Sequence, residues 1–173
     1  MDAIAGTFLD KSRTLITTDY LPKIERCLDR LSDADIWWRP NEASNSAGNL
    51  VLHVCGNARQ WIVSGVGGAA DLRRRQEEFD ERGPLPRAAL LATLDATFRD
   101  IDRALGELDP AVLLERRVIQ GKEVTILEAI LHVVEHVSHH TGQILWIAKA
   151  RSGADLGFWR VEDGVATPTW RSK

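Results

Sequence analysis

The sequence has few of the features that mark disulfide-bonded, membrane or nucleic-acid-binding proteins. Only two of its 173 residues are cysteines, Cys27 and Cys55, and their spacing fits neither a disulfide framework nor a Cys-x-x-Cys site. No apolar run approaches the roughly 20 residues that span a bilayer, and the N-terminus lacks the pattern of a signal peptide. The net charge of −3 argues against binding to phosphates. We therefore expect a cytoplasmic protein that binds neither nucleic acid nor membranes, with both thiols packed inside it.

Several catalytic motifs are also missing. The chain contains no Gly-x-Ser-x-Gly elbow and no His-Glu-x-x-His pair. No glutamate stands three residues before a histidine, so the Glu-x-x-His pairs of di-iron bundles are absent as well. These absences argue against an α/β-hydrolase, a zincin-type protease and a ferritin-like di-iron protein.

Histidines are instead concentrated in one short stretch. Four of the five lie between His132 and His140, in the sequence HVVEHVSHHTGQ, within a long run with apolar residues at helical spacing. Residues four apart on a helix face the same way, so either His132 with His136 or His136 with His140 can present two imidazoles to one metal ion. The alternative is a polar helix edge whose histidines are merely solvated.

The apolar face of this helix favours the second pair. With His136 set at zero, the apolar positions centre near about 110° and His140 falls at about 40°, at the border of the buried stripe. His132 and His139 fall at about −40° and −60°, and so turn progressively outward. We therefore expect His136 and His140 to be ligands, with Gln143 close by.

The fifth histidine, His53, lies in a second helical pattern and borders its buried face in the same way. A third imidazole from a second helix would complete a three-histidine site for a divalent ion. Asn57, one turn after His53, and Gln143, three residues after His140, are candidates to orient the ligands, a bound water or a substrate. Each of these side chains can equally be an ordinary polar residue at a helix edge.

The apolar spacing predicts four long helices, which indicates an all-α four-helix bundle formed by one domain over residues 1–173. The first pattern covers about residues 3–31, with Pro22 expected to loosen one turn. The second begins near residues 44–46 and ends near 65–68. The third begins after Pro86 and ends at Asp109–Pro110, and the last covers about residues 124–150.

The segments between these helices contain fewer patterns that predict structure. Residues 67–84 form a charged connection, expected to be solvated and long enough to cross the bundle. Residues 112–125 suggest an extended pair with a turn at Gln120–Lys122, followed by a capping box from Thr125 to Glu128. The tail after Gly153 is expected to be irregular, but its aromatic residues predict that it packs against the bundle.

Two segments together resemble a known group of proteins. NSAGNLVLHVCGNARQWI (residues 45–62) and HVVEHVSHHTGQIL (residues 132–145) are similar to the DinB-like superfamily of four-helix-bundle metalloproteins, and the likeness covers Trp37 to Phe158. The resemblance implies metal ligands at His53, His136 and His140, with nickel or zinc as the usual ion. It also implies an up-down-down-up bundle, with the long crossover between the second and third helices, and commonly a homodimer. Characterised members include thiol-dependent S-transferases and a mycothiol-dependent maleylpyruvate isomerase.

Two classes of function follow from these residues and this resemblance. The first is a metal-dependent enzyme that transfers a low-molecular-weight thiol or hydrolyses a small substrate. The second is a metal-binding stress-response or ligand-binding protein without turnover. Three imidazoles suit zinc or nickel and also accept iron or manganese. The tryptophans and the aromatic tail offer enough apolar surface to predict a homodimer.

Overall fold

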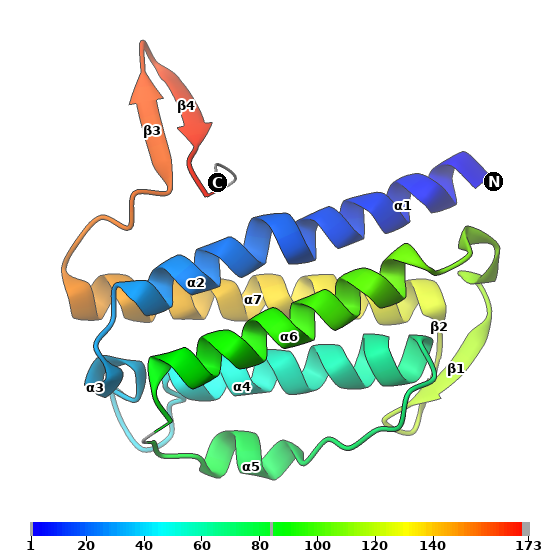
Figure 1. The fold of residues 1–173 in the computed structure, drawn as a ribbon, viewed down its shortest axis with the longest axis horizontal. Coiled ribbons are helices and arrows are strands. Elements are labelled where there is room, and N and C mark those ends of the chain that lie inside the picture. The colour runs from blue at the N-terminus through cyan, green and yellow to red at the C-terminus, as the bar shows by residue number, and fades with distance from the viewer. Residues whose placement is uncertain (1, 84, 171–173) are drawn as a thin grey trace.

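Four long helices form a bundle in which the second and third run parallel and the first and fourth run antiparallel to them (Figure 1). The computed structural model describes residues 2–83 and 85–170. The predicted all-α, up-down-down-up bundle is therefore confirmed. Its four members are α1 (Asp2–Thr14) with η1 (Leu15–Tyr20) and α2 (Leu21–Asp29); α4 (Ala47–Ala58) with η2 (Arg59–Val66); α6 (Arg87–Gly106); and α7 (Ile126–Ser152).

Two of these helices contain a wider, π-helical segment. In η1 the backbone N–H of Leu21 donates to the carbonyl of Ile16, five residues back. This segment directly precedes Pro22, which has no N–H to donate and whose ring crowds the preceding turn, so the predicted loosening takes this form. In η2 the N–H of Gly67 likewise donates to the carbonyl of Ile62. A π-turn rotates the side chains that follow it relative to an ideal α-helix.

The ends of the helices that carry the candidate site are fixed by side chains. Thr125 and Glu128 form the predicted capping box at the start of α7, and Gly153 ends that helix with a left-handed φ of 62°. Ser46 and Asn49 form a second capping box at the start of α4. Each cap fixes where its own helix begins, and the two helices pack directly together.

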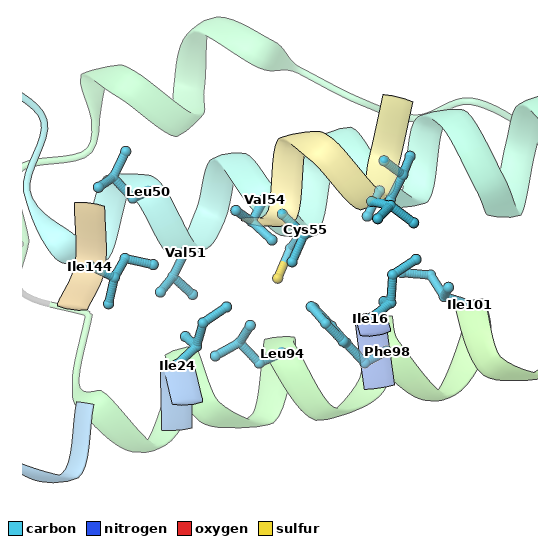
Figure 2. Close-up of a cluster of buried hydrophobic side chains, with 14 of the residues drawn as sticks. Ile16, Ile24, Leu50, Val51, Val54, Cys55, Leu94, Phe98, Ile101 and Ile144 are labelled. Atoms are coloured by element: carbon cyan, nitrogen blue, oxygen red, sulfur yellow. The ribbon is translucent and has the colours of Figure 1, made fainter. Parts of the chain in front are cut away.

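The centre of the bundle is a continuous apolar core (Figure 2). All four helices contribute to it, and α4 packs against both α6 and α7. Both cysteines are buried in this core, and burial raises the pKa of each thiol to about 12, as expected of packed rather than reactive thiols. The labelled core side chains include Ile16, Ile24, Val51, Val54, Leu94, Phe98, Ile101 and Ile144.

The connection between the second and third helices runs back along the bundle and contains the short helix α5 (Arg75–Asp80) (Figure 1). Trp37, which follows the short helix α3 (Asp33–Ile36), fixes the far end of this connection. Its indole N–H donates to the carbonyl of Leu85 at 3.0 Å, and its ring lies where a Cβ at Gly48 or Gly83 would stand. The crossover is therefore packed onto the bundle.

Two small hairpins complete the fold. The predicted extended pair is present as β1 (Arg116–Ile119) and β2 (Lys122–Thr125), preceded by the 3-10 turn η3 (Pro110–Val112). The expectation of an irregular tail was wrong, because β3 (Trp159–Glu162) and β4 (Val165–Pro168) pair antiparallel and extend away from the bundle (Figure 1).

The tail is nevertheless attached, as predicted. Phe158 and Trp170 are buried, and Arg26 donates to the carbonyls of Gly157 and Thr169. Within residues 2–83 and 85–170, no helix combines the length and apolar character that a membrane crossing requires.

Candidate metal centre

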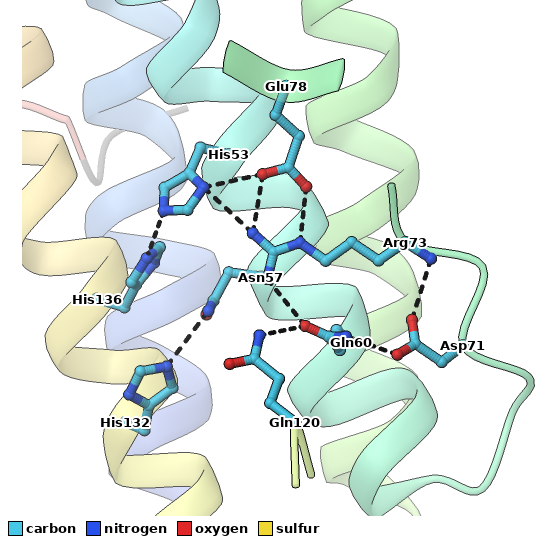
Figure 3. Close-up of polar contacts among 9 residues, drawn as sticks. All are labelled: His53, Asn57, Gln60, Asp71, Arg73, Glu78, Gln120, His132 and His136. Carbon is cyan, nitrogen blue, oxygen red and sulfur yellow. Dashed lines mark hydrogen bonds and ion pairs between the residues drawn. The ribbon is translucent and has the colours of Figure 1, made fainter. Parts of the chain in front are cut away.

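Helices α4 and α7 bring three imidazoles together at their shared face. His53 projects from α4, while His136 and His140 project from successive turns of α7. One potential ligand atom from each of the three lies within 4.8 Å of the others, and the Nε2 atoms of His53 and His136 are 3.0 Å apart (Figure 3). The structure thus brings together the three residues that the sequence predicted as metal ligands.

The far side of the His53 ring contacts an ion pair from the crossover (Figure 3). His53 Nδ1 donates to Glu78 Oε2 at 2.9 Å, and Arg73 binds both oxygens of Glu78 at 2.7 and 2.8 Å. The side chains of Arg73 and Glu78 are only 4% and 10% exposed. The expectation that residues 67–84 are solvated was therefore wrong for Arg73 and Glu78, whose opposite charges neutralise each other beside a buried imidazole, although most of residues 67–83 are exposed.

The surrounding backbone is built to admit Glu78. A Cβ at Gly56 of α4 would overlap the Glu78 carboxylate, so glycine is the residue that leaves room for it. The buried amide of Asn49 donates to the carbonyls of Glu78 and Glu81, which fixes α5 against α4. Burial raises the pKa of the Glu78 carboxyl, but hydrogen bonds from Arg73 and His53 and their charges outweigh it and lower the pKa overall. Glu78 is therefore ionised at neutral pH.

Arg73 extends the polar contacts toward the opposite end of the site. Its Nη1 donates to Gln60 Oε1 at 2.9 Å, and Gln60 in turn donates to Asp71. Gln120, at the turn of the β1–β2 hairpin, also donates to Gln60. The crossover, η2 and the hairpin are thus linked through the side-chain amide of Gln60.

The surroundings of His136 keep its imidazole neutral. Burial, together with the neighbouring imidazoles of His140 and His53, lowers its pKa to about 2, so it is neutral over the physiological range. Its Nδ1 is buried and has no hydrogen-bond partner among the described residues. A neutral imidazole with available nitrogen lone pairs is the form that binds a metal ion.

His140 is oriented from its own helix. Its Nδ1 donates to Gln143 Oε1 at 2.6 Å, so its Nε2 is the nitrogen left free. Burial lowers the pKa of His140, although the hydrogen bond to Gln143 opposes that effect. Gln143 therefore lies where a side chain that orients His140 should lie.

The two other α7 histidines differ from each other. His139 is exposed, as expected. His132 was expected to turn outward, but it is half-buried, stacks on Trp61 at a centroid distance of 4.1 Å, and accepts a hydrogen bond from Asn57 Nδ2 at 3.3 Å. Asn57 therefore orients His132, whereas the sequence placed it beside the proposed ligands.

Trp61 gives the reason for this difference. It lies in η2 with its indole buried, and the indole lies against the His132 ring and covers it. Desolvation lowers the pKa of His132, so this fourth imidazole is neutral as well. Figure 3 shows it one turn of α7 away from His136, on the side opposite His53.

Comparisons with other proteins identify the fold. The family model described as "Protein of unknown function (DUF1572)" matches residues 3–163. A DinB-like protein from Bacillus subtilis is similar in structure, with a TM-score of 0.66 and 18% identity over 86% of this chain and 96% of that chain. A DinB-like protein from Bacillus cereus has a TM-score of 0.61 and 19% identity over 79% of this chain and 88% of that chain. No curated protein matches the sequence. The predicted DinB-like fold is therefore confirmed.

Proposed function

The chain belongs to the DUF1572 family, whose description names no function, and we propose that it is a metal-dependent enzyme. In this proposal His53, His136 and His140 bind one divalent ion. The observation that carries the proposal is the convergence of three imidazoles from two helices, with potential ligand atoms within 4.8 Å of one another.

The spacing of the nitrogens fits this role. Two nitrogens bonded to one ion at about 2.0–2.1 Å lie about 2.8–3.4 Å apart for bond angles between about 90° and 110°. The Nε2 atoms of His53 and His136 are 3.0 Å apart. One proton between these two nitrogens would make a single hydrogen bond. His136 Nδ1 would still be buried without a partner among the described residues. The donor set is thus better suited to a cation than to hydrogen bonding alone.

The outer hydrogen bonds support the same assignment. Because Glu78 accepts the Nδ1 proton of His53, the lone pair of that ring lies on Nε2 and faces His136. Gln143 accepts the Nδ1 proton of His140 and so leaves its Nε2 free. Both partners hold their rings in the orientation and tautomer that metal binding requires, before any ion arrives.

Three neutral imidazoles suit zinc or nickel best, and iron or manganese are also compatible with them. An ion held by three protein ligands supplies a Lewis acid with at least one position left for a substrate. The reaction we propose is the transfer of a low-molecular-weight thiol or the hydrolysis of a small substrate. Around it, the protein's own residues orient the rings and exclude water from one side of the site.

One observation favours the second candidate, a metal-binding stress-response or ligand-binding protein without turnover. Glu78 is a carboxylate that contacts His53, and both of its oxygens are already engaged by Arg73 and His53. It is therefore poorly placed to accept a proton from a substrate. Turnover thus requires the nucleophile itself, a thiol or a water, to be activated at the ion.

Elemental analysis of the purified protein tests the proposal directly. We expect close to one equivalent of zinc or nickel per chain, lost in a His53→Ala, His136→Ala double variant that remains helical by circular dichroism. Titration with zinc that shows no saturable site in the wild-type protein would contradict it. A metal-loaded protein that shows no turnover with any thiol or hydrolysable ester tested would favour the second candidate.

We also propose that the protein is a homodimer in solution. Trp159 and Val161 on the tail hairpin are 56% and 66% exposed, which is a large apolar surface for a monomer to leave in water. Light scattering at micromolar concentrations should give twice the mass of one chain. A monomeric mass across that range would contradict the prediction.

A further inference from the structure

The two helices that carry the three histidines also form the walls of a cavity of about 520 Å³. We propose that this cavity, here called the α4–α7 groove, binds the uncharged, partly apolar portion of a small substrate whose reactive group reaches the three imidazoles. The proposal rests on the proposed function, because it names the kind of substrate that the metal centre receives. The groove is formed by the loop at residues 40–45 and by Leu50, His139, Gly142, Gln143, Trp146 and Ile147.

The groove is adjacent to the candidate metal centre. Gln143 belongs to its wall and accepts the hydrogen bond from His140 at 2.6 Å. Leu50 precedes His53 by three residues on α4, as Gln143 follows His140 by three on α7. Three residues of helix correspond to about 4.5 Å, so the groove begins about one turn from two of the proposed ligands. A molecule of ordinary metabolite size spans both.

The lining of the groove defines the class of ligand. None of the described residues that line it is Asp, Glu, Lys or Arg. Trp146, which is 60% exposed, and the buried Leu50 offer apolar contact, while Ser44 and Asn45 at the loop offer hydrogen bonds. Such a surface suits a flat aromatic or alicyclic group with polar, uncharged substituents.

A second large cavity, of about 490 Å³, lies beneath the crossover, but its chemistry differs. It is lined by several charged residues, among them Arg59, Asp71 and Glu77, and it lies against α4 and η2 rather than α7. Of the three proposed ligands, the Arg73–Glu78 pair that borders this cavity hydrogen-bonds to His53. Of these two cavities, the α4–α7 groove is the one that both ligand-bearing helices line.

Gly142 provides a way to close the groove without disturbing the fold. It lies within α7, is exposed, and a Cβ built there meets no atom within 4 Å. Gly142 lines this groove and also a neighbouring cavity beside Phe158 and Trp159, so a Gly142→Leu variant adds a side chain at the edge of the groove, and it also increases helix propensity. Gly6 in α1 is the matched control, because it too is helical and has open space at its Cβ position.

The test measures binding of the neutral fluorophore N-phenylnaphthylamine to the metal-free and the metal-loaded protein. We expect Gly142→Leu and Trp146→Ala to weaken its binding by about tenfold or more, and Gly6→Leu to leave it unchanged. The anionic relative anilinonaphthalene sulfonate should bind more weakly than the neutral probe. Zinc titration of Gly142→Leu should give wild-type affinity.

The possible outcomes separate this inference from the proposed function. If Gly142→Leu binds the neutral probe as the wild type does, the groove is not the binding site, whatever the metal content. A second outcome is that the wild type is dimeric and binds no probe, whereas Gly142→Leu is monomeric. The groove is then an interface between two copies and the inference is wrong. If the wild type binds no metal but probe binding still depends on Gly142, the groove stands and the metal proposal fails.

Discussion

His53 and His140 face the same candidate site but are held in place in different ways. The ring of His53 contacts a buried carboxylate from 25 residues further along the chain, which is itself paired with a buried arginine. The ring of His140 is held by an amide three residues away on the same helix, at an exposed position. One ligand is thus fixed by tertiary structure and the other by local helix geometry.

This difference has an energetic consequence. A hydrogen bond to a charged group in a desolvated setting is stronger than one between neutral groups at the surface. The Glu78–His53 contact should therefore contribute more to metal binding than the Gln143–His140 contact. It is also coupled to folding, because removing Glu78 leaves the guanidinium of Arg73 buried without its partner.

Removal of a proposed ligand should have the largest effect, and it tests whether His140 binds the metal ion at all. His140→Ala leaves two imidazoles, which hold a divalent ion far less well than three, so zinc affinity should fall on the order of 100-fold or more. Competition with a chromophoric chelator measures this change. His139→Ala is the matched control, because His139 is adjacent and exposed, and its zinc affinity should remain close to that of the wild type.

The fold should survive His140→Ala, because His140 borders the apolar stripe of α7 and is not part of the apolar core. Helical circular dichroism and the denaturant midpoint of the metal-free variant should therefore resemble those of the wild type. Equal loss of zinc affinity in the His139 and His140 variants would mean that the ligand set is wrong.

Removing the buried carboxylate is expected to have the next largest effect. Glu78→Ala should weaken zinc binding by about 10- to 100-fold, because His53 loses the group that fixes its tautomer and orientation. It should also lower the free energy of unfolding by about 3 kcal/mol, because Arg73 is left buried and unpaired. Chelator competition and urea denaturation measure the two effects separately.

Glu77→Ala is the control for this variant. Glu77 lies on the same short helix, but its side chain is 70% exposed and pairs with Arg74 at the surface, so the expected loss is below about 0.5 kcal/mol. Glu78→Gln can still accept the Nδ1 proton of His53 and should recover part of the zinc affinity. If Glu78→Ala is destabilised but keeps wild-type zinc affinity, Glu78 is only the structural partner of Arg73.

The same contrast explains what the sequence could predict. The α7 site was predictable because its parts are local: His136, His140 and Gln143 share one helical face, and a helix has a known periodicity. His53 was predictable from its place at the edge of an apolar stripe. The four helices and the capping box at Thr125 followed from the same local rules.

The residues that were missed depend on contacts between distant segments. Glu78 and Arg73 occur in a run of charges that is typical of a solvated loop, and only the packing of α5 on α4 at Gly56 brings them inside. His132 was misplaced because the spacing within α7 alone cannot anticipate that Trp61, from the second helix, covers its ring. The tail hairpin is an exception, because it had a local signal: Asp163 and Gly164 join its strands with positive φ angles, and Asp-Gly is a typical two-residue hairpin turn.

The pH dependence of stability tests whether burial keeps His136 of α7 neutral. The pKa of His136 is lowered to about 2, so below about pH 6.5 the unfolded chain binds a proton that the folded chain does not. Stability from this group is therefore fully present above about pH 6.5 and is lost as the pH falls toward 2. Between about pH 7.5 and 5.5 the metal-free protein should lose about 1 kcal/mol from His136 alone.

Urea denaturation of the metal-free protein at several pH values measures this loss. A His136→Asn variant supplies the reference, because the difference between the two proteins removes the contribution of all other titrating groups. The wild type should lose stability faster than the variant as the pH falls below about 6.5. Parallel curves for the two proteins would show that His136 is not held neutral by burial.

The smallest expected effect concerns Gln143. It tests directly whether the local support of His140 is weaker than the long-range support of His53. Gln143→Ala removes a hydrogen bond between neutral groups at an exposed position, where water can take its place, so zinc affinity should fall only about threefold. Because alanine has a high helix propensity, α7 should remain intact. Chelator competition should therefore place Gln143→Ala close to the wild type and well above Glu78→Ala. If the two variants lose equal affinity, local and long-range support of the ligands are equivalent, and burial of the Glu78–Arg73 pair adds nothing to metal binding.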